Sequence, residues 1–326
     1  GTDKGAFNPT GILTREQAAK IICYMLLGSS GAEKLTTNTS TFTDVAAGRW
    51  SAGYIAYCAN LDILAGTGNG AFNPEGELTG LAFGKMLLVA LGYDPDIENY
   101  VGKDWATNVA SDMVDANIAP DGVVLSESLS RDNAAQMAFQ TLEANMVKYS
   151  NKGTTVIGSD GMQVIVGASE AAAVASTNSV DYDGSADDIQ QFCEKYFSKL
   201  TKETVSGDDF GRPGYSWELD GTEIASGADD PVASFTTAFT KKDLYNALGK
   251  STSDKIEDGD YTVDYYLNGN DSVTGVWVND NGNSDYDLED LSSEKSSTTK
   301  LGDNGLLVEV YVDKDASTEV TVVMIG

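Results

Sequence analysis

The hydrophobic pattern of the chain changes near residue 148. Before that point apolar residues recur every three or four positions, which is typical of amphipathic helices. The clearest such stretch begins after Thr14, a residue suited to a helix N-cap, and stops at Gly28. After residue 148 apolar and polar residues alternate, which is the period of half-buried strands. The pattern predicts a mixed fold, with a helical region followed by an α+β region.

The second region, residues 149–326, is expected to contain both strands and helices. A turn sequence between two β-branched runs predicts a hairpin. Whether the region forms one domain or divides into 149–250 and 251–326 is left open. The hairpin strands are expected at 154–157 and 163–166, the helices at 186–200 and 241–248, and the later strands at 261–267, 273–278, 306–312 and 319–325.

A short motif occurs twice in the helical region. The sequence Gly-Ala-Phe-Asn-Pro at residues 5–9 returns unchanged at residues 70–74, an offset of 65 positions. A second offset, of 55 positions, places Trp50 on Trp105 and indicates a third, more degenerate copy. A unit of this size cannot close a core alone, so the copies are expected to pack on one another.

Further motifs accompany each copy in a fixed order. They are a Phe-Thr-Asp-Val sequence, a Trp-Ser pair that opens a helix, a loop ending in Gly, the Gly-Ala-Phe-Asn-Pro turn and a Leu-Thr-Arg-Glu sequence before a second helix. They stand at residues 42–45, 50–51, 62–66, 70–74 and 13–16. In this order the motifs resemble the S-layer homology repeat, and the resemblance covers about residues 1–148.

The resemblance implies three repeats arranged as an all-α, pseudo-threefold spindle. Residues 1–28 would be the second half of the first repeat, 29–95 the second repeat and 96–148 the third. The first repeat lacks its leading helix, so the native polypeptide is expected to begin further upstream. The α+β region that follows is then a surface domain.

The resemblance also implies a function. Members of this family hold non-covalently to an acidic, often pyruvylated, secondary cell-wall polysaccharide, in grooves between neighbouring repeats. The chain is therefore expected to be secreted and to lie on the cell wall, where the α+β region builds or presents a surface layer through self-association. A carboxylate on such a sugar is best held by an arginine fork.

Two arginines occupy the motif position at the start of a second helix. The chain has four arginines, and Arg15 and Arg131 are the two at this position. A cation at a helix N-terminus is unfavourably placed with respect to the helix dipole, which indicates an anionic partner. A structural ion pair, to Glu16 or Asp132, is the alternative. The second repeat has Gly80 at this position, which predicts a weakened groove.

Trp50, Trp105 and Lys103 complete the candidate polysaccharide site. A tryptophan that opens a helix can stack on a sugar ring or anchor the core, and both readings stay open. Lys103 is either a cationic contact or a solvated surface residue. No residue is predicted to be catalytic.

Composition excludes several classes of function. The formal charge is −29, which excludes a protein that binds nucleic acid by neutralising phosphates. The chain has no histidine, so Ser-His-Asp catalysis and most zinc sites are excluded. No apolar run is long enough to span a membrane. The three cysteines, Cys23, Cys58 and Cys193, are odd in number, far apart and without the spacing of a metal site. They are therefore expected to form neither a metal site nor a disulfide framework, and to be small buried residues.

Two other functions and one cation site remain as alternatives. The α+β region could bind a host or dietary glycan, for which Tyr215 and Trp217 would have to line a groove. An anchored glycoside hydrolase would need only two carboxylates, and the sequence does not single out a pair. The Asp-rich loop at 279–287 carries many oxygen ligands, but its spacing is not that of an EF-hand, so calcium is only the minor alternative to a solvated turn. No other cofactor is expected.

Overall fold

The computed structural model describes most of the chain as two compact units. Unit 1 comprises Gly1–Asn178 and Asp188–Ser198, and unit 2 comprises Ser179–Asp187 and Lys199–Gly326. Helices dominate the first unit and sheets the second, so the mixed fold is confirmed. The described residues are 5–37, 42–157, 163–178, 181–184, 187–271, 300–302, 305–312 and 319–326.

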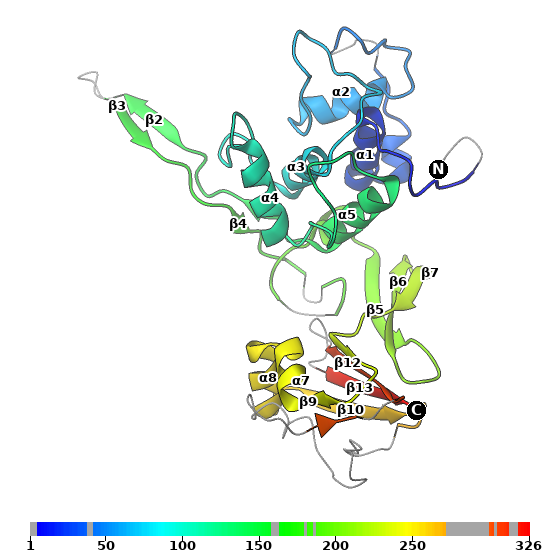
Figure 1. Cartoon of the computed structure of the whole chain (residues 1–326). Coiled ribbons are helices and arrows are strands. Elements are labelled where there is room, and N and C mark those ends of the chain that lie inside the picture. The colour runs from blue at the N-terminus through cyan, green and yellow to red at the C-terminus, as the bar shows by residue number, and fades with distance from the viewer. Residues whose placement is uncertain are drawn as a thin grey trace. The chain divides into compact units, whose positions relative to one another are not determined.

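Amphipathic helices form the bulk of unit 1 (Figure 1). Each buries one apolar face in a common core, which also takes in Phe72 and Tyr100 from the loops. Gly28 has a φ of 65° and interrupts the first helix, as its position in the pattern predicts. The helices are α1 (Arg15–Ala32), α2 (Ala52–Asn60), α3 (Gly80–Leu91), α4 (Trp105–Asp115) and α5 (Arg131–Glu143).

Three short segments of unit 1 are joined by a closed ring of backbone hydrogen bonds. The Leu13 amide donates to the Leu129 carbonyl at 2.9 Å, the Leu78 amide to the Leu13 carbonyl at 3.0 Å, and the Leu129 amide to the Leu78 carbonyl at 2.8 Å. All three leucine side chains are buried. The ring joins the segments that precede α1, α3 and α5, and it gives the three leucines equivalent backbone partners.

The first turns of these three helices are held in the same way. In each, the first helical amide donates to a carbonyl of another copy, which satisfies a donor that has no partner within the helix. The donor and acceptor pairs are Arg15 to Gly76, Gly80 to Glu127, and Arg131 to Gly11.

A close contact with Leu125 explains why position 80 is a glycine. A Cβ atom there would lie 3.0 Å from Cα and 3.1 Å from the carbonyl oxygen of Leu125. The amide of Leu81 donates to that same carbonyl at 2.8 Å. The backbone at Leu125 therefore lies against the start of α3, where α1 and α5 instead begin with an arginine.

The prediction of a helix at 186–200 is wrong for most of these residues. Ile189 and Gln191 lie in antiparallel bridges with Ala175 and Asn145. Between them, the Gln190 amide donates to the Val174 carbonyl and the Gln190 carbonyl accepts from the Met146 amide, both at 2.8 Å. Only α6 (Phe192–Tyr196) is helical. Long-range backbone pairing thus overrides the local apolar stripe, although Phe192 and Cys193 are buried as that stripe requires.

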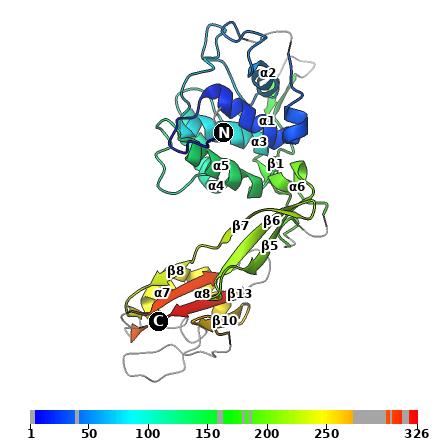
Figure 2. The same cartoon turned by 90° about the vertical axis from the view of Figure 1, so that its right-hand side faces the viewer.

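Short strands complete unit 1. The expected hairpin is confirmed as β2 (Thr154–Ile157) paired antiparallel with β3 (Gln163–Val166). Figure 2 shows unit 1 from a second side. Two-residue strands β1 (Val147–Lys148) and β4 (Ala172–Ala173) also pair antiparallel.

Unit 2 contains an antiparallel meander and a mixed sheet. The meander has the order β5-β6-β7, formed by Leu200–Ser206, Pro213–Leu219 and Thr222–Ala228. The mixed sheet has the order β10-β13-β12-β8, with β10 parallel to β13 and the other pairs antiparallel. Its strands are Thr262–Leu267, Glu319–Ile325, Leu307–Val312 and Ala233–Phe235. A further pair joins β9 (Phe239–Thr240) and β11 (Lys300–Leu301).

Two helices contribute to the core of the mixed sheet. Leu244 and Leu248 of α7 (Lys241–Leu248) and Ile256 of α8 (Lys250–Glu257) pack with the valines of β12 and β13. The helix expected at 241–248 is confirmed, as are the strands expected at 261–267, 306–312 and 319–325. The strand expected at 273–278 lies outside the described residues.

A glycine-to-alanine exchange tests the packing of α2. A Cβ atom on Gly53 would lie 2.5 Å from the carbonyl oxygen of Leu35. In an unhindered helix Gly→Ala stabilises by about 1 kcal/mol, but here the contact is expected to reverse the sign and to destabilise by about 1–3 kcal/mol. Thermal denaturation of Gly53→Ala measures the effect. Gly48→Ala is the control, because no atom lies within 4 Å of its Cβ position, and a higher midpoint for Gly53→Ala would contradict the packing described.

The sequence also predicted buried cysteines and no membrane-spanning segment. All three cysteines are buried and none of them forms a disulfide bond in the structure, which confirms that they are small buried residues. Across the described segments, no helix is both long and apolar enough to cross a membrane.

Candidate functional site

A cavity of about 410 Å³ lies between the copies in unit 1. It is bounded by the start of α1, the loop before α3, the buried side of α3 and the start of α4. We call it the Arg15 groove. Its lining residues are Arg15, Ile63, Leu64, Ala65, Gly66, Phe72, Leu78, Ala82, Lys85, Met86, Tyr100, Val101, Gly102 and Trp105.

The Arg15 guanidinium is held in a fixed orientation by the second copy. Its Nε donates to the carbonyl of Phe72 and one terminal nitrogen donates to the carbonyl of Ala65, both at 2.8 Å. The guanidinium carbon lies 4.5 Å from the centre of the Phe72 ring. Burial lowers the pKa of Arg15, and the nearby charge of Asp44 partly offsets this effect. An arginine nevertheless stays charged at neutral pH.

The structural ion pair considered for Arg15 and Arg131 is not formed. Within the described residues neither arginine makes an ion pair. Carbonyls instead use only part of the donor capacity of Arg15, since a guanidinium carries five N–H donors. The arginine is therefore positioned by two carbonyls, and Asp44 is a nearby negative charge that forms no ion pair with it.

The charge of the groove is positive, in contrast to the chain as a whole. Lys85 is its second cation and donates from Nζ to the Tyr100 carbonyl at 2.7 Å. Burial lowers the pKa of Lys85, while Asp96 acts in the opposite direction. The lining contains two cations and no carboxylate, although the chain carries a formal charge of −29.

The structure brings Arg15 and Trp105 into one cavity, but Lys103 lies outside its lining. The Lys103 side chain is 91% exposed and its Nζ lies 3.8 Å from a carboxylate oxygen of Asp104. Sequence reasoning missed Lys85. The signal was present, because Lys85 stands 65 positions after Lys20, the same offset that relates the two Gly-Ala-Phe-Asn-Pro motifs.

Arg131 repeats the geometry of Arg15 on the first copy. Its Nε donates to the carbonyl of Phe7 at 2.9 Å, as Arg15 donates to Phe72, and its guanidinium carbon lies 5.5 Å from the Phe7 ring. Another of its nitrogens lies 3.5 Å from the side-chain oxygen of Gln17.

Trp50 belongs to a cluster of three aromatic rings around one lysine, in which Tyr24 and Tyr54 are partly buried. The Nζ of Lys20 lies 5.3 Å from the Tyr24 ring, 5.9 Å from the Trp50 ring and 5.8 Å from the Tyr54 ring. Trp50 is 53% exposed. By the two repeat offsets, Lys20 and Trp50 correspond to Lys85 and Trp105 of the Arg15 groove.

The remaining arginine of the repeats has a structural role. Arg49 donates from Nε and a terminal nitrogen to the two carboxylate oxygens of Glu16, at 2.7 and 2.8 Å, and it also reaches Glu75 at 2.8 Å. Ser51 donates to Glu16 at 2.5 Å. Burial opposes ionisation of Glu16, but the bonds from Arg49 and Ser51 outweigh it and lower the pKa of Glu16. The pair fixes the start of α1, where Arg15 stands.

This arrangement predicts a loss of stability in acid. Because the pKa of Glu16 is lowered from 4.5 on folding, its stabilising contribution is present above pH 4.5 and is lost as the pH falls through the folded-state value. The thermal midpoints of the wild type and of Glu16→Gln, followed from pH 6 to pH 3, should therefore converge as the pH falls. A constant gap between the two curves would show that Glu16 does not titrate as described.

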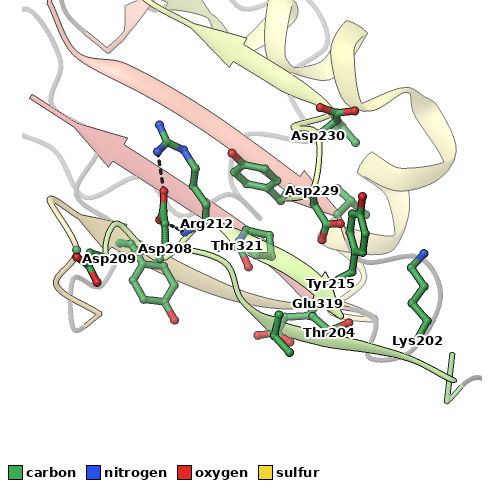
Figure 3. Close-up of a pocket in the computed structure, with 18 of the residues that line it drawn as sticks. Lys202, Thr204, Asp208, Asp209, Arg212, Tyr215, Asp229, Asp230, Glu319 and Thr321 are labelled. Carbon is green, nitrogen blue, oxygen red and sulfur yellow. Dashed lines mark hydrogen bonds and ion pairs between the residues drawn. The ribbon is translucent and has the colours of Figure 1, made fainter. Parts of the chain in front are cut away.

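A second cavity, of about 620 Å³, lies within unit 2 and is acidic (Figure 3). Its described lining has six carboxylates, including Asp208, Asp209 and Glu319, and two cations. One cation, Arg212, forms ion pairs with two carboxylates, Asp208 at 2.8 Å and Glu309 at 2.6 Å. Burial opposes ionisation of Asp208, yet its hydrogen bonds with Arg212 lower its pKa overall. An acidic polymer would be repelled here.

The two aromatic residues considered for glycan binding separate in the structure. Tyr215 lines the acidic cavity, whereas Trp217 is 2% exposed and stacks on Tyr182 with ring centres 5.5 Å apart. Trp217 therefore does not form a binding surface. The loop at 279–287 considered for calcium lies outside the described residues, and among the residues that are described no group of acidic and cysteine side chains could hold a metal ion.

Comparisons with known proteins agree with the motifs. Residues 41–83 match the model of the S-layer homology domain. The chain is 26% identical over 266 residues to the cell surface protein of Thermoanaerobacter kivui, a match that covers 77% of this chain and 33% of that protein. It is 29% identical over 119 residues, 36% of this chain, to the surface layer protein of Brevibacillus choshinensis, covering 10% of that protein. It is 24% identical over 156 residues, 48% of this chain, to the middle cell wall protein of Brevibacillus brevis, covering 14% of it. The matches span a third or less of these relatives.

Proposed function

We propose that this chain, a cell-envelope surface protein with an S-layer homology domain at residues 41–83, is anchored to the cell wall through its helical copies. The ligand of the proposed anchor is an acidic, pyruvylated secondary cell-wall polysaccharide. The Arg15 groove holds one carboxylate-bearing sugar of that polymer. The binding is non-covalent and needs no catalytic residue.

The observation that carries this proposal is the charge of the groove. Two cations and no carboxylate line a cavity in a strongly acidic chain. Burial strengthens the attraction between a cation and an anionic ligand, because less water screens it. The groove volume of about 410 Å³ suits a sugar or two rather than a folded partner.

Each lining group has a role in this reading. Arg15, oriented by two carbonyls, offers its remaining donors to the sugar carboxylate. Lys85 adds a second positive charge on the opposite helix. Trp105, half-buried in the same lining, supplies an apolar face for the pyranose ring.

The ring of leucine hydrogen bonds supports a pseudo-threefold spindle of three repeats. It gives the segments before α1, α3 and α5 equivalent partners. On this proposal Arg131, Trp50 and Lys20 form a second, related groove on the first copy. The third groove has Gly80 in place of arginine and binds weakly or not at all.

We propose further that residues 149–326 take part in the surface layer. The match to the T. kivui cell surface protein supports this, because its 266 residues extend beyond the 148 that carry the repeats. Assembly of the purified chain with rising concentration, followed by light scattering and electron microscopy, tests this part. A chain that stays monomeric at every concentration would contradict it.

The anchoring is tested by sedimentation with cell-wall sacculi. The chain is expected to sediment with native sacculi and to stay in solution when the secondary polymer has been stripped from them. Equal sedimentation with both preparations would contradict the proposal. The stripped sacculi are the control for this experiment, so the whole chain can be used and no shorter fragment is needed.

A further inference from the structure

Two cysteine side chains from different helices touch inside unit 1. Cys23 lies on α1 and Cys58 on α2, and their Sγ atoms are 3.6 Å apart. Both residues are completely buried. Each Sγ also lies 3.6 Å from a carbonyl of the facing helix, that of Tyr54 for Cys23 and that of Ala19 for Cys58. The two helices are thus in direct contact at the sulfur atoms.

The related contact in the second and third copies contains no cysteine. The repeat offsets of 65 and 55 place Cys23 on Leu88 and Cys58 on Met113. Both of these residues are also buried, on α3 and α4, which pack on each other. Apolar side chains therefore suffice for packing at this place, so packing alone does not explain why the first contact has two thiols.

We propose that Cys23 and Cys58 form a disulfide bond when the protein is outside the cell. A disulfide needs an Sγ–Sγ distance of about 2.05 Å, so the two atoms must approach by about 1.5 Å. Side-chain rotation and a small shift of α2 can supply this movement. Disulfides persist in the oxidising environments of secreted and surface proteins. The inference depends on the surface location and not on polysaccharide binding.

The reaction is a thiol–disulfide exchange with an external disulfide, such as oxidised glutathione. The thiolate of one cysteine attacks a sulfur of the external disulfide and releases one thiolate, which leaves a mixed disulfide on the protein. The second cysteine then attacks the protein sulfur of that mixed disulfide, so the protein S–S bond forms and the second external thiol leaves. The protein loses two protons and two electrons, and the external disulfide is reduced to two thiols.

The bond is expected to form during folding rather than in the folded chain. The hydrogen bond with Cys23 and burial both raise the pKa of Cys58, so the reactive thiolate is rare in the native state. Completed, the bond would tie α1 to α2, the two helices that carry the Lys20, Tyr24 and Tyr54 side chains.

The test is to refold the whole chain in a buffer of oxidised and reduced glutathione. The intact mass is expected to fall by about 2 Da, for two hydrogens. The number of free thiols, titrated in denaturant, should fall from three to one, and a digest should yield a linked peptide containing Cys23 and Cys58. The thermal midpoint should rise by about 5–10 °C and return to its original value with a reducing agent.

Two variants separate this bond from other oxidation. Cys193→Ala should fall from two free thiols to none, with the same rise in midpoint, because Cys193 takes no part. Cys58→Ala should keep both thiols and show no rise. Three free thiols after refolding, a mass increase from bound glutathione, or a linked peptide containing Cys193 would each overturn the proposal, as would a lower midpoint for the cross-linked protein.

Discussion

Replacement of Arg15 with alanine is expected to lower the affinity of the chain for the secondary wall polymer about 30- to 100-fold. The variant removes a charge-assisted hydrogen-bond donor whose worth is about 2–3 kcal/mol. The effect should exceed that of any surface lysine, because Arg15 is half-buried and already oriented by the Phe72 and Ala65 carbonyls. Titration of the purified polymer at constant salt measures it, and an unchanged dissociation constant would contradict the assignment of the groove.

Two further variants sharpen this test. Arg15→Lys keeps the positive charge but loses the fork, so it should restore only part of the affinity. Lys103→Gln removes a charge of the same sign from outside the groove lining and should bind almost as the wild type does. Thermal midpoints of all three proteins show whether the lost carbonyl contacts of Arg15 have disturbed the fold.

Replacement of Arg49 with alanine is expected to destabilise unit 1 by about 2–3 kcal/mol. The variant leaves the Glu16 carboxylate, which is 7% exposed, without the cation that forms two bonds with it. Loss of one partner of a fully buried pair costs about 3–5 kcal/mol, and the lower value allows for the 25% exposure of the Arg49 side chain. The midpoint of thermal unfolding should fall by about 5–10 °C.

Glu75→Ala is the matched control for Arg49→Ala. Glu75 binds the same arginine at 2.8 Å, but its side chain is 78% exposed, so its loss should change stability by no more than about 0.5 kcal/mol. Equal effects of the two variants would show that the pair between Arg49 and Glu16 is not the one that holds the start of α1.

Local signals predicted much of unit 1. The helices of the copies follow from their apolar period, and the break in α1 follows from Gly28, which adopts a φ of 65° that other residues rarely adopt. The repeated motif also placed Arg15 and Arg131 at equivalent helix starts, and both donate from Nε to a phenylalanine carbonyl. Positions related by a repeat inherit the same neighbours, which explains why this part was predictable.

Long-range contacts account for what the sequence did not predict. The apolar stripe at 186–200 favours a helix, but backbone hydrogen bonds that join Gln190 to Val174 and Met146 exclude Gln190 from it. The role of Arg49 likewise depends on Glu16, which lies 33 positions away and is brought near only by the packing of α1. Lys85 and Arg15 line one cavity for the same reason. Distances of this kind follow from tertiary packing and have no local signature.

The most direct test of the central claim compares one polymer in two chemical states. Calorimetric titration of the whole chain with the native secondary wall polymer, and with the same polymer after chemical removal of its pyruvyl groups, isolates the carboxylate from the rest of the glycan. Saturable binding to the native polymer that is lost with the pyruvyl groups, and that weakens as salt is raised, is the predicted result. Equal affinity for both polymers would contradict an anionic ligand in the Arg15 groove.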